Sequence, residues 1–491
     1  MKKFHLISAC FLIVLTLTWS CKEKVEGGGG GADADIEEDI DTDVVTTSSD
    51  CNLTSAEFNA WFKSGVASTN GIVVNANSVD FTHLNNCDFY KWSEQMFLWI
   101  TSVTSGQLVI ESHVFYTISP SEDGVRNFIP HVAGTPLRAF SNINKIDTEE
   151  GQATSDVLMD RNNNIIYYIS FGNDVYAQFL TGAKNGALNG DTFPTTAAEL
   201  DSIVNYAKQF NVELLDADAL AIELKTSWVV ASSLANAADF VTADAIIPTY
   251  DKTDSLWVIT GEETVTLAMV GAHIVGSAAE HPEMIWATFE HQDNTPNAKY
   301  EYINAVGDTI KVPADGNGSW IFNSEVSVTP NVSHMTFSND SIIAKTNFTI
   351  SPSNTVREKP WGSSYDTQPN PEDLTPAAAN TTVINLNNSI TKLLLGSDVR
   401  KNYQFIGATW TNNGAAPNGE SWSPTNTTDG VAIGGSQLAN STMETYAQNG
   451  PNYNNFGTCF SCHSNSSAPS LKPIDISHVF DDIAPLPNES N

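Results

Sequence analysis

The sequence predicts an α+β fold that is strand-rich through its N-terminal and middle regions and ends in a partly helical C-terminal segment. Stretches of β-branched and aromatic residues, bounded by turn-forming residues, recur through the middle of the chain. Segments with helical spacing of apolar residues lie on either side of them. A length of 491 residues, of which 41% are hydrophobic, suffices for two or three packed regions.

Helices are expected at 54–63, 86–101 and 197–210, where apolar residues recur at three- and four-residue spacing. Thr54 and Glu57 have the spacing of a capping box at the start of the first helix. The aromatic and methionine side chains of 86–101 are expected to form core.

Strands are expected at 108–118, 163–171 and 227–232, and three consecutive strands of one sheet at 256–261, 263–275 and 284–290. After a Pro-, Asn- and Thr-rich stretch the chain is apolar and ordered again at 383–395 and 403–410. A long loop is expected at 414–435 and a helix at 437–448.

These elements suggest a domain organisation. Residues 51–353 are predicted to form the strand-rich α+β region, which can comprise two subdomains. Residues 354–380 are predicted to form an exposed linker, and residues 381–491 a separate C-terminal region.

The N-terminus is typical of a secreted lipoprotein. Residues 1–20 combine two lysines with an apolar run that is too short to span a bilayer, which predicts a signal peptide. A small residue precedes Cys21, which is therefore expected to be the lipidated mature N-terminus, although a leucine three residues before it is missing. Residues 21–50 are Gly-rich and acidic and predict a solvated tether. The expected location is the outer membrane, facing the periplasm or the cell surface.

Composition disfavours one class of partner. The 23 Lys and Arg against 57 Asp and Glu give a formal charge of −34. A surface of this sign repels phosphate backbones, so nucleic-acid binding is not expected, whereas cationic protein partners are compatible with it.

Six cysteines divide among these features. Cys10 is lost with the signal peptide and Cys21 is the lipid site. Cys51 and Cys87 are expected to pair as a disulfide in an oxidising compartment, and two buried thiols are the alternative. The remaining two lie near the C-terminus.

Cys459-Phe460-Ser461-Cys462-His463 is the strongest chemical signal in the chain. Two thiols at this spacing can each add to one vinyl group of haem, and the adjacent histidine can bind the iron. A disulfide, a zinc site and a redox dithiol are the alternatives. A zinc site would need a second pair of ligands, and a dithiol oxidoreductase is expected beside a βαβ unit. We therefore expect one covalent haem c, bound through Cys459 and Cys462, with His463 as proximal iron ligand.

The sequence leaves the sixth iron ligand open. No methionine follows His463, so the arrangement common in small cytochromes is excluded. His273 is the first candidate for the distal ligand, followed by Met443 and His478. A five-coordinate iron is the alternative.

Three blocks resemble a family of exported bacterial proteins described as cytochrome c family proteins. They are CDFYKW with MFLW at 87–92 and 96–99, GAHIV with MIWATFEH at 271–275 and 284–291, and LANSTMETY at 438–446. The blocks extend over most of the mature chain. The resemblance implies one haem c with the motif histidine as proximal ligand, and it implies no particular substrate.

Three functions are compatible with these features. The first is electron transfer by a membrane-tethered mono-haem cytochrome with a redox partner protein. The second is a haem c enzyme of peroxidase or oxygenase type with an open sixth iron position. Its distal acid–base groups would come from His273, His281, Glu283 and His291. The third is a surface glycan-binding module with structural haem, suggested by the tryptophans at 361, 410 and 422.

Overall fold

A computed structural model describes residues 51–121, 124–139, 156–338, 340–362, 372–435, 438–445, 459–464 and 472–487. The chain divides into two compact units, Met1–Val44 and Val45–Asn491. The predicted signal peptide, Cys21 and the tether lie outside the described residues, so only the second unit is described below.

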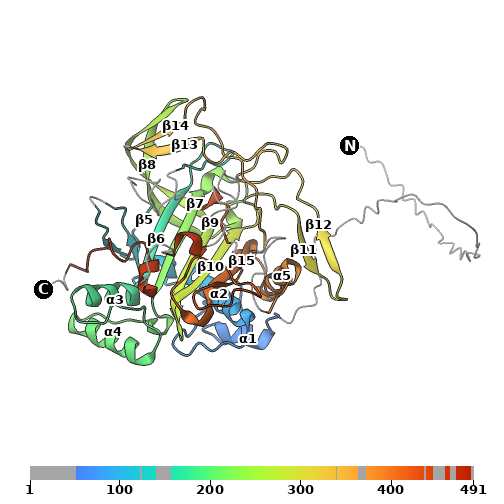
Figure 1. The fold of residues 1–491 in the computed structure, drawn as a ribbon. Helices are drawn as coiled ribbons and strands as arrows, with labels where there is room; N and C mark the ends of the chain where they lie inside the picture. The colour runs from blue at the N-terminus through green and yellow to red at the C-terminus, as the bar shows by residue number, and fades with distance from the viewer. Residues whose placement is uncertain are drawn as a thin grey trace, which may run out of the picture. The chain divides into compact units, whose positions relative to one another are not determined.

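A single mixed sheet of 12 strands organises the described part of this unit (Figure 1). Its main path is β16-β15-β10-β9-β7-β6-β3-β4, and β8, β5, β13 and β14 attach beside β9. Neighbouring strands are antiparallel except β5 and β8. The strands are β3 (Phe115–Ile118), β4 (Phe128–Pro130), β5 (Leu137–Arg138), β6 (Tyr167–Asn173), β7 (Ile222–Val230), β8 (Thr242–Lys252), β9 (Leu256–Ala278), β10 (His281–His291), β13 (Met335–Ser338), β14 (Ser341–Ala344), β15 (Tyr403–Thr411) and β16 (Ala432–Gly434).

Strand β9 connects the main path of the sheet to the strands that attach beside it. The strands predicted at 256–261 and 263–275 form this one strand of 23 residues. Its first part pairs with β8 and its last part lies between β7 and β10. Gly261 does not end the strand, because it pairs with Thr249 of β8, and the neighbouring Thr260 is the extra residue of a bulge in β9.

Three of the four predicted helices are confirmed. They are α1 (Ser55–Trp61), α2 (Asn86–Ile100) and α4 (Ala197–Gln209), and the capping box of Thr54 and Glu57 is present. Two further helices, α3 (Asp174–Lys184) and α5 (Pro376–Leu393), were not predicted as helices. The latter includes most of the apolar stretch at 383–395.

Helix α2 packs against one face of the sheet, as its spacing predicts. Phe97 stacks on Phe289 of β10 with ring centroids 4.3 Å apart, and Phe89 stacks on Trp410 of β15 at 3.7 Å. Met96 is fully buried beside them. Burial of such side chains stabilises by about 1.5–3 kcal/mol each, so this face is core and not a cofactor site.

The disulfide between Cys51 and Cys87 is confirmed, with Cα atoms 5.5 Å apart. It joins the segment before α1 to the first turn of α2. The two helices therefore share one covalent loop that lies against the sheet.

The helix predicted at 437–448 is wrong over its described residues 438–444, which form an irregular turn. Side chains here compete with the backbone carbonyls of a helix for the backbone N–H groups. Asn440 Oδ1 accepts hydrogen bonds from the backbone and hydroxyl of Thr442, and Glu290 accepts from the backbone of Ser441. The strand predicted at 108–118 also starts later, because Val109–Glu111 form a 3₁₀ turn.

The predicted linker does not coincide with a boundary between compact units. Near its start Arg357 is buried at 1% exposure, and α5 begins before its end. Strand β15, from the predicted C-terminal region, pairs with β10 from the middle of the chain. The two regions share one sheet, whose register brings residues far apart in sequence together.

Two small hairpins complete the described strands. The first joins β1 (Val103–Thr104) to β2 (Gln107–Leu108), and the second joins β11 (Tyr300–Ile303) to β12 (Thr309–Val312). The second hairpin lies beside α5 (Figure 1).

Candidate functional site

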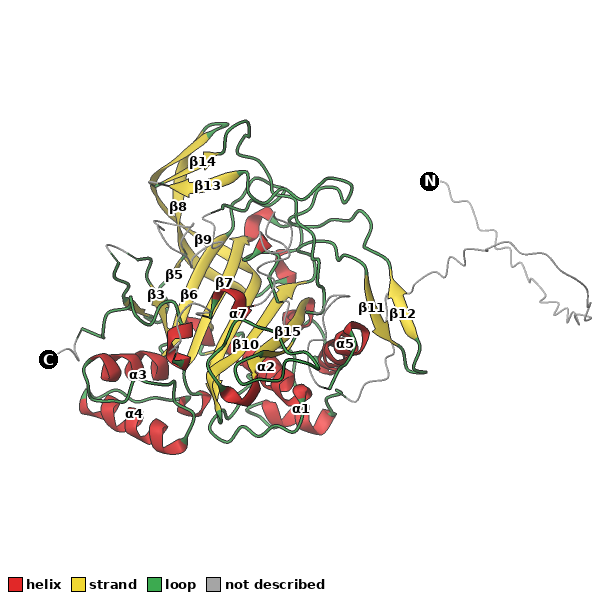
Figure 2. Ribbon diagram, in the orientation of Figure 1, coloured by secondary structure: helices red, strands yellow, loops and turns green. Residues whose placement is uncertain are grey.

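The cysteine motif forms a single helical turn, α7 (Cys459–Cys462), which Figure 2 shows in front of β7 and β10. The backbone N–H of His463 donates to the Cys459 carbonyl at 2.9 Å and closes the turn. Cys459 is half-buried and Cys462 is exposed, and neither is bonded to another cysteine of the described ranges. The motif therefore presents two thiols and a histidine from one turn of chain.

His463 is held by a backbone carbonyl. Its Nδ1 lies 2.9 Å from the Ile476 oxygen, which can only accept, so Nδ1 carries the proton and Nε2 carries a lone pair. Burial lowers the pKa of His463 to about 4. A neutral imidazole whose second nitrogen donates to a carbonyl is the form in which histidine binds metal ions.

Aromatic rings surround this imidazole. The Trp286 ring centroid lies 4.4 Å from that of His463, and Phe460 packs edge-on against the same indole at 5.7 Å. His478 stacks almost flat on His463 with centroids 4.0 Å apart and an interplanar angle of 16°. The motif histidine is therefore fixed on two sides.

The segment 472–487 supplies both the carbonyl and the stacking ring, and a buried polar group anchors it. Ser477 Oγ donates to Glu223 Oε2 at 2.7 Å and lies 3.0 Å from the Tyr176 hydroxyl. Lys184 Nζ donates to the Ile483 carbonyl at 2.6 Å. Sequence reasoning missed Ser477 and Glu223, because their partners are hundreds of residues apart and no local spacing indicates the contact.

A second polar group lies on the same side of the sheet. His273 Nε2 is 2.8 Å from Glu444 Oε2, and its Nδ1 is 2.8 Å from the Thr288 hydroxyl. Lys225 Nζ lies 4.0 Å from the other oxygen of Glu444. Burial alone would raise the pKa of Glu444, but the nearby His273 and Lys225 lower it to about 2, so the carboxylate is charged.

The charges of this polar group, His273, Glu444 and Lys225, also affect the cysteine motif electrostatically. The pKa of the Cys459 thiol is raised above its ordinary value, first by burial and then by the negative charge of Glu444. Lys225, Glu444 and His273 also contribute to the electrostatic field at His463.

None of the three candidate distal ligands is placed across from Nε2 of His463. Both nitrogens of His273 are engaged by other side chains. Met443 is fully buried in a different apolar cluster, with Tyr168 and Phe240. His478 lies flat against His463, whereas two imidazoles on opposite sides of one ion would have centroids about 6 Å apart, given metal–nitrogen distances near 2 Å.

The other candidate acid–base groups do not gather at the motif. His281 and Glu283 pair with each other at the start of β10. His291, at the far end of the same strand, stacks on Phe240. The strand separates these side chains, so they do not form one distal site with His273.

The tryptophans suggested as an exposed binding surface are not exposed. Trp410 and Trp422 are 4% and 9% exposed and belong to the main core, and Trp361 packs against it. The sequence expectation of tryptophan-rich surface loops is wrong, because the loop at 414–435 folds back on the sheet edge through β16.

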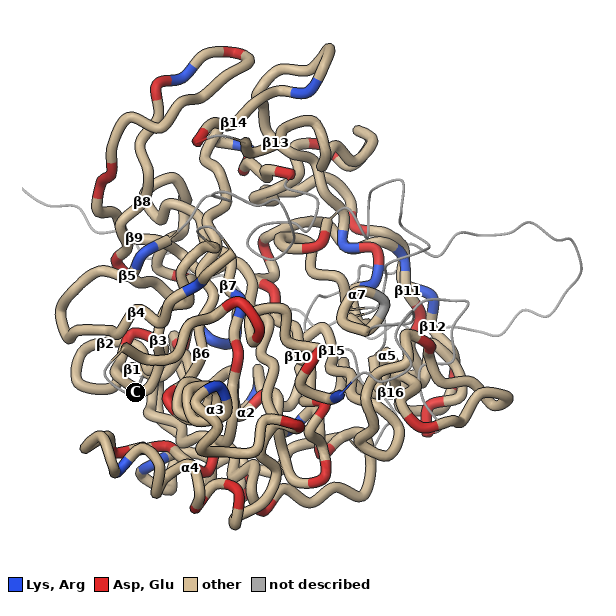
Figure 3. Tube along the Cα trace, turned by 60° about the vertical axis from the view of Figure 1, so that its left-hand side comes forward, with Lys and Arg blue, Asp and Glu red and all other residues tan. Residues whose placement is uncertain are grey.

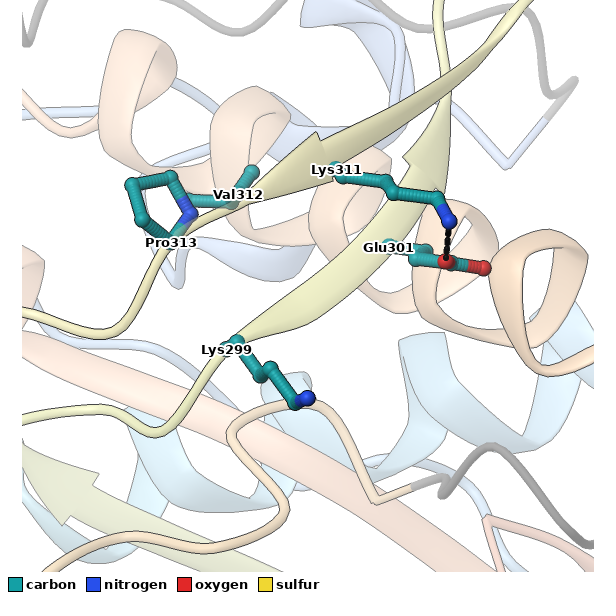
Figure 4. Close-up of a pocket in the computed structure, with 5 residues that line it drawn as sticks. All are labelled: Lys299, Glu301, Lys311, Val312 and Pro313. Carbon is teal, nitrogen blue, oxygen red and sulfur yellow. Dashed lines mark ion pairs between the residues drawn. The ribbon is translucent and has the colours of Figure 1, made fainter.

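One surface pocket of about 350 Å³ lies on the β11–β12 hairpin (Figure 4). Lys311 Nζ lies 3.5 Å from Glu301 across the hairpin, and Lys299, Val312 and Pro313 complete the lining. Lys311 is 81% exposed, so this ion pair contributes little. The pocket offers no group with chemistry related to the cysteine motif.

No helix in the described ranges is long and apolar enough to cross a bilayer. Among those same residues no three His, Cys, Asp or Glu side chains converge as a metal site. A haem iron needs only one or two protein ligands, so this finding does not bear on haem. No protein-family model, curated protein or solved structure matches the chain.

Proposed function

We propose that this chain is a membrane-tethered mono-haem c-type cytochrome that acts in electron transfer. Cys459 and Cys462 would form the two thioether bonds, and Nε2 of His463 would bind the iron. The observation that carries the proposal is the hydrogen bond from His463 Nδ1 to the Ile476 carbonyl, which leaves Nε2 with its lone pair.

The bound haem would supply a one-electron iron couple. Residues of this chain would have three roles around the haem. Ile476 and Trp286 fix the orientation of His463. The anchor of Ser477 on Glu223 keeps segment 472–487 in place. The charges of Lys225, Glu444 and His273 would together set the electrostatic field around the iron.

The acidic surface supports a positively charged redox partner. Figure 3 shows Asp and Glu positions distributed over much of the described trace, in keeping with the formal charge of −34. Long-range attraction to a cationic partner would raise the association rate at low salt. We expect ruthenium hexaammine to oxidise the reduced protein faster as salt falls, and ferricyanide to oxidise it more slowly.

The proposal is tested on mature protein made in a cell with working cytochrome maturation. One haem per chain is expected in the pyridine haemochrome assay, with a mass increase that survives denaturation. Replacement of both Cys459 and Cys462 by Ser should abolish it. Colourless protein with no added mass beyond polypeptide and lipid would overturn the proposal.

The two members of the stacked histidine pair give a matched comparison. His463→Ala should change the ferrous spectrum and allow strong binding of added imidazole, because it removes the proximal ligand. His478→Ala should retain the native spectrum. Equal effects of both variants would contradict the assignment of His463.

A haem enzyme with an open sixth position is a second candidate. One observation favours it: His273 is engaged by other side chains, Met443 is buried in another cluster, and His478 stacks flat on His463. A high-spin ferrous spectrum and rapid carbon monoxide binding would support the enzyme. A low-spin spectrum without carbon monoxide binding would support electron transfer.

A further inference from the structure

A buried histidine–glutamate pair stands at the start of β10, apart from the cysteine motif. His281 is 5% exposed and Glu283 is fully buried. His281 Nδ1 lies 2.9 Å from Glu283 Oε1, which also accepts from the backbone of Thr411 at 3.1 Å. A carboxylate oxygen accepts, so Nδ1 carries the ring proton and Nε2 carries a lone pair.

Two atoms of this pair have no hydrogen-bond partner among the residues that the structure describes. His281 Nε2 and Glu283 Oε2 are both buried and unsatisfied. A buried polar atom without a hydrogen bond destabilises the folded state, and this pair has two such atoms. A bound group at Nε2 would satisfy one of them.

A second imidazole faces the first. The half-buried His83, in the loop before α2, has its ring centroid 5.0 Å from that of His281 with an interplanar angle of 62°. Two imidazoles bound to one tetrahedral ion at metal–nitrogen distances near 2 Å have centroids about 5 Å apart. Asp88 and Glu280 add negative charge near His83.

The backbone at this point is strained. Glu280 and Met284 have φ of 67° and 66°, a region that residues other than glycine rarely adopt. The pairing of β9 with β10 shifts register between His281 and Ile285. A bulge of this kind redirects side chains and is frequent beside functional sites.

We propose that His83 and His281 bind a divalent transition-metal ion, with Zn²⁺ as the representative, and that Glu283 orients His281. The described residues supply two nitrogen ligands to this site. A carboxylate that accepts from the second nitrogen of a ligating histidine is the usual support of such a ligand. This inference is independent of the haem proposal.

The test is calorimetric titration of Zn²⁺ into the purified haem-loaded protein, with physiological salt and excess Mg²⁺ to occupy surface carboxylates. One saturable site per chain is expected. His83→Ala and His281→Gln should each weaken binding at least tenfold. Glu283→Gln should weaken it about 10–100-fold.

His113 is exposed and provides the matched control, since His113→Ala should leave the titration unchanged. His83→Ala removes a half-buried ring, and its unfolding temperature without metal reports whether the fold is intact. In the wild type Zn²⁺ should raise that temperature, and in His83→Ala it should not. Absence of saturable binding would overturn the proposal, as would binding that survives both His83→Ala and His281→Gln.

Discussion

The buried ion pair between Glu290 and Arg357 gives a sharp test of how the segment before the cysteine motif is held. Arg357 donates to Glu290 Oε2 through Nε at 3.0 Å and Nη2 at 2.9 Å. Glu290 Oε1 accepts from the backbone of Ser441 at 2.8 Å. Both charged side chains are at most 1% exposed, so neither charge can be solvated if the other is removed.

Glu290→Gln keeps the shape of the side chain and removes its charge. It leaves the Arg357 guanidinium buried without a counter-ion, which costs about 3–5 kcal/mol in comparable buried pairs. The amide oxygen can still accept one hydrogen bond, so we expect a loss near the lower end, about 3 kcal/mol. The chain offers a matched control in Arg138 and Glu262, which are 2.8 Å apart but about half exposed.

The assay is urea unfolding followed by circular dichroism, with midpoints compared at unchanged slope. Glu262→Gln should cost less than about 1 kcal/mol, because solvent screens an exposed pair. The double variant Glu290→Gln/Arg357→Met should recover part of the loss, since no buried charge remains. Similar losses for Glu290→Gln and Glu262→Gln would refute the reasoning.

Three further predictions concern single sites. Burial raises the pKa of Glu94 to about 8 from 4.5, so its contribution to stability is complete below pH 4.5 and is lost as the pH rises to about 8. Across that window, the free energy of unfolding of Glu94→Gln should rise relative to that of the wild type by up to about 1.4 kcal/mol per pH unit. If the unfolding free energies of the two proteins change in parallel with pH, the prediction is wrong. Replacing Cys51 and Cys87 together by Ala should cost about 2–5 kcal/mol in thermal unfolding, and no change would show that the bridge is dispensable. Ser477→Ala should lower the free energy of unfolding by about 1–3 kcal/mol and increase amide hydrogen exchange in segment 472–487. Unchanged exchange in that segment would argue against the role of Ser477 as its anchor.

Local patterns predicted local structure well. The capping box at Thr54 and the aromatic spacing of 86–101 specify α1 and α2, because helix start signals and one buried face depend on residues three or four apart. The pairing of Cys51 with Cys87 followed from cysteine count and compartment. Because these patterns involve only neighbouring residues, they also led to one wrong prediction, the helix at 437–448. At 438–444 the helical pattern lost to hydrogen bonds with Glu290, a residue far away in sequence.

The sequence by itself determined the α+β class, the helices α1, α2 and α4, the disulfide and the cysteine motif that motivates the haem proposal. Only the tertiary structure decided that residues before and after 354–380 share one sheet, because strand register depends on pairing between distant segments. It also decided what surrounds His463. The Ile476 carbonyl, the Trp286 ring and the Ser477 anchor come from separate parts of the chain, and no periodicity connects them. The physical reason is that burial and hydrogen bonding act through space, whereas sequence patterns record only neighbours along the chain.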